Sequence, residues 1–228
     1  MTRTTNARLA GFTFLFYIAI ALPSMVLLDR ATNAEGIAAK LARVAEHASD
    51  VRLAIVLSLI SCFAALVLAI TLYAITREVD PDLALLALAC RVGEGVINAP
   101  SIAAAAGLLW LATGAATSAT DGASTHTLGA FLLKFQDWNV TISATFFAVG
   151  STLFAWLLLR GRMIPVALAW LGVLASILLV VALPLQLAGV LPGPMAQLMW
   201  LPMLAFEVPL GFWLLIKGVA VPSRRPSA

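Results

Sequence analysis

The sequence predicts an all-α fold, a bundle of helices that crosses a membrane. Of its 228 residues, 62% belong to the apolar set and only 11% are charged, against about 45–50% and about 25% in ordinary soluble domains. The mean hydropathy is +1.01. This composition excludes a disordered protein, a nucleic-acid-binding domain and an ordinary cytosolic enzyme. We expect one integral membrane domain over residues 1–228.

Six apolar stretches are long enough to cross a bilayer, whose hydrocarbon core of about 30 Å needs about 20 residues of helix. Asp80 and Pro81 are typical of a helix start, as are Gly193 and Pro194, and Gly161 is typical of a helix end. We therefore predict six transmembrane helices: Leu9–Leu28, Leu53–Thr76, Leu83–Leu111, Thr127–Leu159, Met163–Leu187 and Ala196–Lys217.

The segment between the first two stretches predicts a short amphipathic helix. Residues 32–35, Thr-Asn-Ala-Glu, fit a capping box, and apolar residues then recur at helical spacing from Ile37 through Leu41 and Val44 to Ala48. We expect this helix to lie on the outer membrane surface or to cap the bundle. A structural cap and a functional lid both remain open.

The distribution of Lys and Arg predicts the orientation in the membrane. These residues are more numerous at the two termini and in the second and fourth connections than on the opposite side. Because cytoplasmic loops are enriched in Lys and Arg, we expect both termini in the cytoplasm. The same enrichment explains the net charge of +3 without an acidic partner.

Four polar residues fall near the middle of predicted membrane helices. Arg91, Glu94 and Asn98 share one face of the third helix, and Glu207 lies ten residues before Lys217 in the sixth. A charge at this depth costs about 2.5–3.5 kcal/mol on insertion scales and is a functional hypothesis by default. We predict that Arg91 approaches Glu207 at matching depth and that Glu94 completes the cluster. A structural ion pair that fixes helix register is the competing interpretation.

A second polar group begins the fourth helix, at the predicted outer interface. It consists of Lys134, Gln136, Asp137 and the interfacial aromatic Trp138. This group could line an outer mouth, or it could be a solvated pair at the interface.

Small residues and prolines mark further positions within the helices. Ala99, Ala103 and Gly107 form a stripe that would let a second helix, such as one from an oligomer partner, approach closely. Prolines inside a span free a backbone carbonyl and kink the helix. Those inside predicted spans are Pro100, Pro184, Pro202 and Pro209.

Motifs for catalysis, metals and cofactors are missing from the sequence. Two cysteines (Cys62 and Cys90) and two histidines (His47 and His126) have no metal-ligand spacing. No serine-hydrolase elbow, zinc-protease helix or phosphate-binding loop is present, and we place His126 in a loop tip. We predict no metal, no cofactor and no catalytic residue, although an intramembrane enzyme stays a third possibility.

Several short segments resemble an uncharacterised bacterial membrane family, the "domain of unknown function" family four-three-eight-six. They are residues 7–11, Arg91-Val92-Gly93-Glu94, Gln136-Asp137-Trp138, residues 157–172, and the ending from Glu207 through Trp213 to Lys217 and Gly218. The resemblance implies a multi-spanning protein of the bacterial cytoplasmic membrane and supplies no activity. The family usually carries His where this chain has Gln136, which puts any role of that imidazole in doubt here.

Two functional classes compete on these observations. The first is translocation of a small solute, an ion or a proton, with Arg91 as the fixed cation and one of the two glutamates as the titrating group. The second is a non-catalytic accessory protein that senses lipid or binds a partner. The lipid bilayer is the expected surrounding in both cases.

Overall fold

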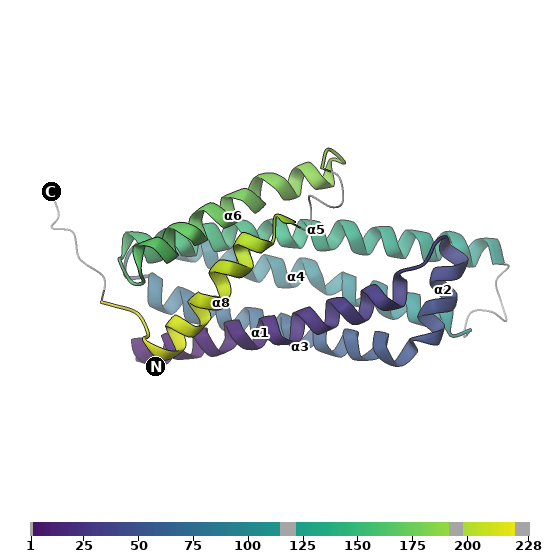
Figure 1. The fold of residues 1–228 in the computed structure, drawn as a ribbon, viewed down its shortest axis with the longest axis horizontal. Helices are drawn as coiled ribbons and strands as arrows, with labels where there is room; N and C mark the ends of the chain where they lie inside the picture. The colour runs from purple at the N-terminus through teal and green to yellow at the C-terminus, as the bar shows by residue number, and fades with distance from the viewer. Residues whose placement is uncertain (1, 115–121, 192–197, 222–228) are drawn as a thin grey trace. The chain divides into compact units, whose positions relative to one another are not determined.

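The computed structural model describes residues 2–114, 122–191 and 198–221, and every regular element in these ranges is a helix. The predicted all-helical fold is confirmed. Figure 1 shows the helices along the chain. Their bounds within the described ranges are α1 Arg3–Thr32, α2 Ile37–Glu46, α3 Ala48–Thr76, α4 Pro81–Ala112, α5 Gly122–Arg160, α6 Val166–Leu187 and α8 Leu201–Ile216.

Five of these helices are long and apolar enough to cross a membrane: α1, α3, α4, α5 and α6. The predicted count of six spans is not confirmed, because α8 has 16 residues and is about 24 Å long at 1.5 Å per residue. Its predicted start at Ala196, with Gly193 and Pro194 before it, lies outside the described residues.

The chain forms two compact units. The first comprises Met1–Tyr17, Ala64–Gly95 and Thr141–Ala228, and the second comprises Ile18–Phe63 and Val96–Val140. The helices α1, α3, α4 and α5 each contribute residues to both units, whereas α6 and α8 belong to the first and α2 to the second.

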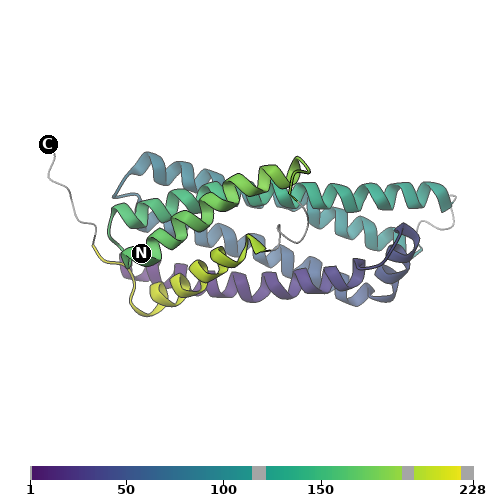
Figure 2. The same cartoon turned by 45° about the horizontal axis from the view of Figure 1, so that its top comes forward.

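Two close helix crossings hold α8 within the first unit. A Cβ atom added at Gly11 of α1 would lie 2.6 Å from the Gly211 carbonyl oxygen and would also meet the Leu215 backbone. On the other side α6 packs along α8, where Gly172 leaves room for the ring of Phe206. Figure 2 shows α8 beside both helices. Glycine thus lets α8 approach α1 at backbone distance and lets a ring of α8 pack against the α6 backbone.

The start of α4 is capped as the sequence predicts. The Leu83 backbone N–H donates to Asp80 Oδ1 at 3.2 Å, and Arg160 at the end of α5 forms an ion pair with Asp80 Oδ2 at 2.8 Å. The hydrogen bond from Leu83, together with the nearby Arg160 charge, holds the pKa of the Asp80 carboxyl below its ordinary value. Asp80 therefore ties the start of α4 to the end of α5 while ionised.

The end of α5 shows why Gly161 is present. The Met163 N–H donates to the Leu158 carbonyl and the Arg162 N–H to the Leu159 carbonyl, which together form a Schellman motif. The residue in the left-handed conformation is Arg162, with φ of 51°, rather than the glycine. Gly161 instead gives space, because a Cβ there would lie 2.9 Å from Val79 Cγ2.

The amphipathic helix between the first two spans is confirmed as α2 in the second unit, but its predicted capping box is wrong. α1 continues to Thr32, whose hydroxyl donates back to the Leu28 carbonyl at 2.9 Å, and α2 begins only at Ile37, too far along the chain for Thr32 to be its N-cap. Gly36 precedes α2 instead. Leu41 and Val44 are buried in the small apolar clusters of this unit, so α2 packs against its neighbours; whether it is a structural cap or a lid stays open.

The structure places some of the predicted prolines and small residues differently from what the sequence led us to expect. Pro202 lies in the first turn of α8, where proline fits a helix, so its predicted role as a helix breaker is wrong. Pro100, Pro184 and Pro209 do lie inside helices. In the predicted small-residue stripe, Ala99 and Ala103 are exposed, whereas Gly107 packs against Leu132 of the same chain.

Candidate functional site

Three charged side chains are buried among the described residues of the first unit. Arg91 and Glu94 lie one turn apart on α4, and Glu207 lies in the middle of α8. Their exposed fractions are 2%, 7% and 7%. Charged residues are almost never buried to this extent without partners, so the cluster is the strongest candidate for a functional site.

The guanidinium pairs with one carboxylate and acts on the other at longer range. Arg91 Nη1 lies 2.8 Å from Glu94 Oε2. Glu207 is attracted by the Arg91 charge and repelled by the Glu94 charge, but no ion pair joins it to Arg91 among the described residues. The predicted meeting of Arg91 with Glu207 is therefore an electrostatic interaction, and the direct contact is with Glu94.

α5 positions the guanidinium and supplies most of its surroundings. The charge lies 4.6 Å from the centre of the Phe147 ring, a cation–π contact that favours a buried guanidinium. The Arg91 stem passes Gly150, where an added Cβ would lie 3.0 Å from Arg91 Cγ. Ser143 donates to the Glu94 carbonyl at 2.9 Å and fixes the same turn of α4 against α5.

Sequence reasoning missed this contribution from α5. Ser143, Phe147, Gly150 and Phe154 recur at spacings of three and four residues and so share one helix face. A glycine between two aromatic residues on such a face indicates that something bulky approaches closely. That signal could have identified α5 as the helix against Arg91, although not the identity of the approaching residue.

Asn98, the fourth member of the predicted cluster, falls in the second unit. In that unit Asn139 of α5 donates its side-chain amide to the Ile97 carbonyl and to the Ser101 hydroxyl of α4. These bonds join α4 to α5 within that unit. Asn98 therefore remains a predicted site residue without a described role.

The predicted outer polar group also lies in the second unit. Lys134 Nζ lies 5.5 Å from the centre of the Trp138 ring, and Asp137 interacts electrostatically with Lys134 and with Lys40 of α2. Gln136 is half-buried beside them. The amphipathic helix α2 thus adds a second cation to the group, which sequence reasoning missed. Its role as an outer mouth stays a prediction.

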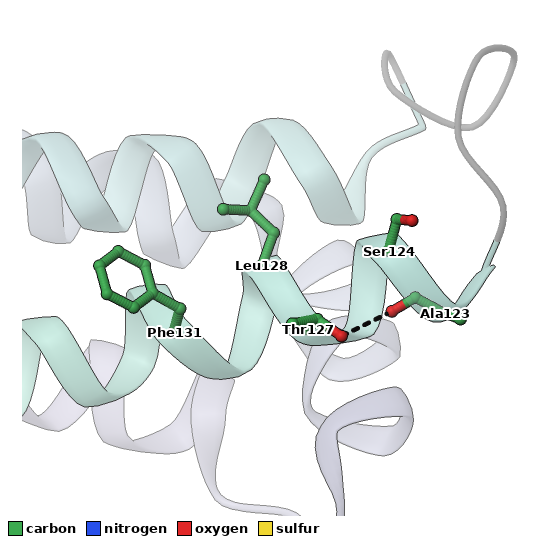
Figure 3. A pocket seen from close by; sticks show the side chains of 5 residues that line it. All are labelled: Ala123, Ser124, Thr127, Leu128 and Phe131. Atoms are coloured by element: carbon green, nitrogen blue, oxygen red, sulfur yellow. Dashed lines mark hydrogen bonds between the residues drawn. The ribbon is translucent and has the colours of Figure 1, made fainter.

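Two cavities bear on what the described residues could bind. The first is a shallow depression on one side of α5, drawn in Figure 3, where the Thr127 hydroxyl donates to the Ala123 carbonyl. A single helix lines it, through Ala123, Ser124, Thr127, Leu128 and Phe131. The second, in the first unit, is lined by Arg91 and Ser151 among apolar side chains and has a volume of only about 10 Å³. Neither offers convergent polar groups with room for a solute.

Metal binding finds no support in the described part of the chain. No group of three or more His, Cys, Asp or Glu side chains lies together there. His126, predicted in a loop tip, lies instead within α5, because that helix begins at Gly122.

Comparison with known proteins gives a family and no activity. A family model described as "Domain of unknown function (DUF4386)" matches residues 9–218. No curated protein and no solved structure matches the chain.

Proposed function

The chain belongs to the family described as "Domain of unknown function (DUF4386)", and we propose that it is a membrane protein that binds and translocates protons. The binding groups in this proposal are Glu94 and Glu207, and Arg91 is the fixed cation beside them. The family description names no activity, so the proposal is drawn from the buried cluster alone.

The observation that carries the proposal is the charge of that cluster. Two carboxylates share one guanidinium, and all three groups are more than nine-tenths buried. With both acids ionised the cluster carries one uncompensated negative charge, which costs several kcal/mol in a low-dielectric interior. Buried acids avoid that cost by taking up a proton. One proton shared by Glu94 and Glu207 makes the cluster neutral.

The size of the adjoining space favours a proton over a larger cargo. The cavity lined by Arg91 holds about 10 Å³, whereas pockets for small organic ligands measure roughly 300–1,000 Å³. Of the cargoes that sequence reasoning left open, a small solute is the least compatible with this space. A proton needs only hydrogen-bonding groups along its route.

The proposal includes a location and a topology. We place the protein in the bacterial cytoplasmic membrane with both termini inside, following the excess of Lys and Arg on that side. α8 would be the sixth crossing, and its 16 residues would suffice where the bilayer thins locally or flanking residues extend to the interface. In that arrangement Glu207 lies far from either membrane surface.

Proton flux into proteoliposomes tests the proposal. Purified protein is reconstituted with an internal pH dye, and a potassium gradient with valinomycin supplies the driving potential. Glu207→Gln removes one proton-binding carboxylate, and Glu46→Gln is the matched control, because Glu46 is exposed at the end of α2. We expect flux from the wild type and the control, and flux at the level of protein-free vesicles from Glu207→Gln. Equal flux from all three, or none from the wild type, contradicts translocation.

The second candidate function is a non-catalytic accessory protein in which the cluster ties helices together. The observation that favours it is the packing of the cluster against α5, where the Arg91 guanidinium lies 4.6 Å from the centre of the Phe147 ring and Ser143 donates to the Glu94 carbonyl. This function predicts no proton flux and a stable complex with a partner protein. Absence of flux together with specific co-purification of one membrane protein would decide for it.

A further inference from the structure

Arg91 has fewer hydrogen bonds than a buried guanidinium needs. The group carries five N–H donors, yet its Nε and Nη1 atoms are buried without a hydrogen-bond partner among the described residues. The contact between Nη1 and Glu94 Oε2 is a close ion pair whose geometry leaves both atoms without a hydrogen bond. Buried donors of this kind are nearly always satisfied by protein or by ordered water.

Arg91 is one of the residues that line the small cavity of the first unit. Its other polar lining residue is Ser151 of α5, and apolar side chains from α1, α3, α5 and α8 close the rest. The neighbouring Thr152 hydroxyl donates back to the Ala148 carbonyl of its own helix, so it does not serve Arg91. The cavity volume of about 10 Å³ is at the minimum that one water molecule needs.

We propose that this cavity is a binding site for one water molecule that bridges the Arg91 guanidinium and the Ser151 hydroxyl. The water accepts a hydrogen bond from Arg91 and exchanges one with Ser151, which gives it the two polar partners that a buried water requires. Ser151 is thereby a positioning residue for Arg91. This inference goes beyond proton translocation, since it holds whether or not the cluster exchanges protons.

The chemistry of the site selects water over other small ligands. A cation would be repelled by the Arg91 guanidinium, and the volume of about 10 Å³ leaves no room for a polyatomic anion. An apolar cavity of this size stays dry, but the lining of this one includes Ser151 and Arg91, whose guanidinium has buried donors without a partner. Water is neutral and small, and it can both donate and accept.

Solid-state NMR in lipid bilayers tests the site directly. Protein with ¹⁵N-labelled arginine is measured with magnetisation transfer from water protons to the Arg91 Nε–H. The resonance is assigned by Phe147→Leu, which removes the ring that shifts it. Ser151→Ala removes one partner of the water, and Ala155→Ser places a tethered hydroxyl in the cavity that Ala155 lines. Thr152→Ala is the matched control, because it removes a hydroxyl one residue away that bonds within α5.

We expect water transfer to Arg91 Nε–H in the wild type and in Thr152→Ala, weaker transfer in Ser151→Ala, and loss in Ala155→Ser. Absence of transfer in the wild type overturns the proposal. Transfer that persists unchanged in both Ser151→Ala and Ala155→Ser overturns it too, because the water would then lie elsewhere. The readout requires no proton flux, so failure of the translocation proposal leaves this test intact.

Discussion

Replacing Gly11 by alanine is expected to force α1 and α8 apart. The new Cβ would lie 2.6 Å from the Gly211 carbonyl oxygen and 2.9 Å from Leu215 Cα. Both neighbours are backbone atoms, so no side-chain rotation relieves the clash. Ordinary contact begins near 3.4 Å, and the Leu215 backbone nitrogen lies nearer still to the added Cβ. The two helices must therefore separate by at least about 0.8 Å at this crossing.

The cost of that separation follows from packing principles. Overpacking a close contact destabilises a protein by about 1–3 kcal/mol, while alanine regains up to about 1 kcal/mol of helix propensity over glycine. We expect a net loss of roughly 1–2 kcal/mol in the free energy of unfolding, which lowers the folded-to-unfolded ratio by a factor of roughly 5–30.

Unfolding in mixed lipid–detergent micelles with increasing SDS measures this effect. Gly95→Ala is the matched control, because nothing lies within 4 Å of a Cβ added at Gly95 of α4. The control gains helix propensity without a clash and should unfold at the same SDS as the wild type or at higher SDS, whereas Gly11→Ala should unfold at lower SDS. Equal stability of the two variants would refute the backbone crossing between α1 and α8.

Three further outcomes are expected. Gly150→Ala should displace the stem of Arg91, because an added Cβ would lie 3.0 Å from Arg91 Cγ. The clash should lower the free energy of unfolding by about 1–3 kcal/mol. Unfolding in SDS measures this loss, and unchanged stability would argue against the contact. Asp80→Asn should be less stable than the wild type near neutral pH, because the lowered pKa of Asp80 reflects a hydrogen bond from the first turn of α4 that favours the ionised form. The stability that the ionised Asp80 contributes is present above the unfolded pKa of about 3.9 and is lost as the pH falls through the folded pKa. The thermal unfolding temperatures of the two proteins should therefore converge in acid. A difference that stays constant with pH would contradict the role of Asp80 as the cap of α4. Arg91→Leu should reduce the yield of folded protein, because it leaves the buried carboxylates without a cation, at a cost of about 3–5 kcal/mol in stability. Adding Glu207→Leu should restore part of the yield. Simple additivity of the two losses would speak against coupling between Arg91 and Glu207.

The sequence predicts the spans because long apolar runs leave little choice of structure in a bilayer. Local chemistry was equally informative where one residue decides the outcome, as at Asp80, whose carboxylate caps α4. Reasoning from local chemistry failed at Thr32, because a threonine hydroxyl can either cap the next helix or form a hydrogen bond to a carbonyl of its own helix. Here the apolar run of α1 continues far enough that the second option holds.

The sequence predicted which charged residues would form the candidate site, but not which side chains contact one another. Depth along the predicted helices leads us to expect Arg91, Glu94 and Glu207 in the membrane interior, yet depth does not say which carboxylate receives the guanidinium. That choice depends on α5, whose Gly150 leaves space for the arginine stem and whose Phe147 ring lies against the charge. Such packing between distant segments has no local signature in a single sequence.

The most direct test of the central claim is infrared titration of the buried carboxyls in lipid nanodiscs. Spectra are recorded between about pH 4 and pH 10, a range that covers the strongly shifted acids found in protein interiors. Glu94→Gln and Glu207→Gln assign the carbonyl band of the protonated acid. The account predicts one protonated carboxyl that is lost and regained reversibly within this range and that disappears in Glu207→Gln, Glu94→Gln or both. Two carboxylates that remain ionised throughout, or one proton that never leaves, would contradict it.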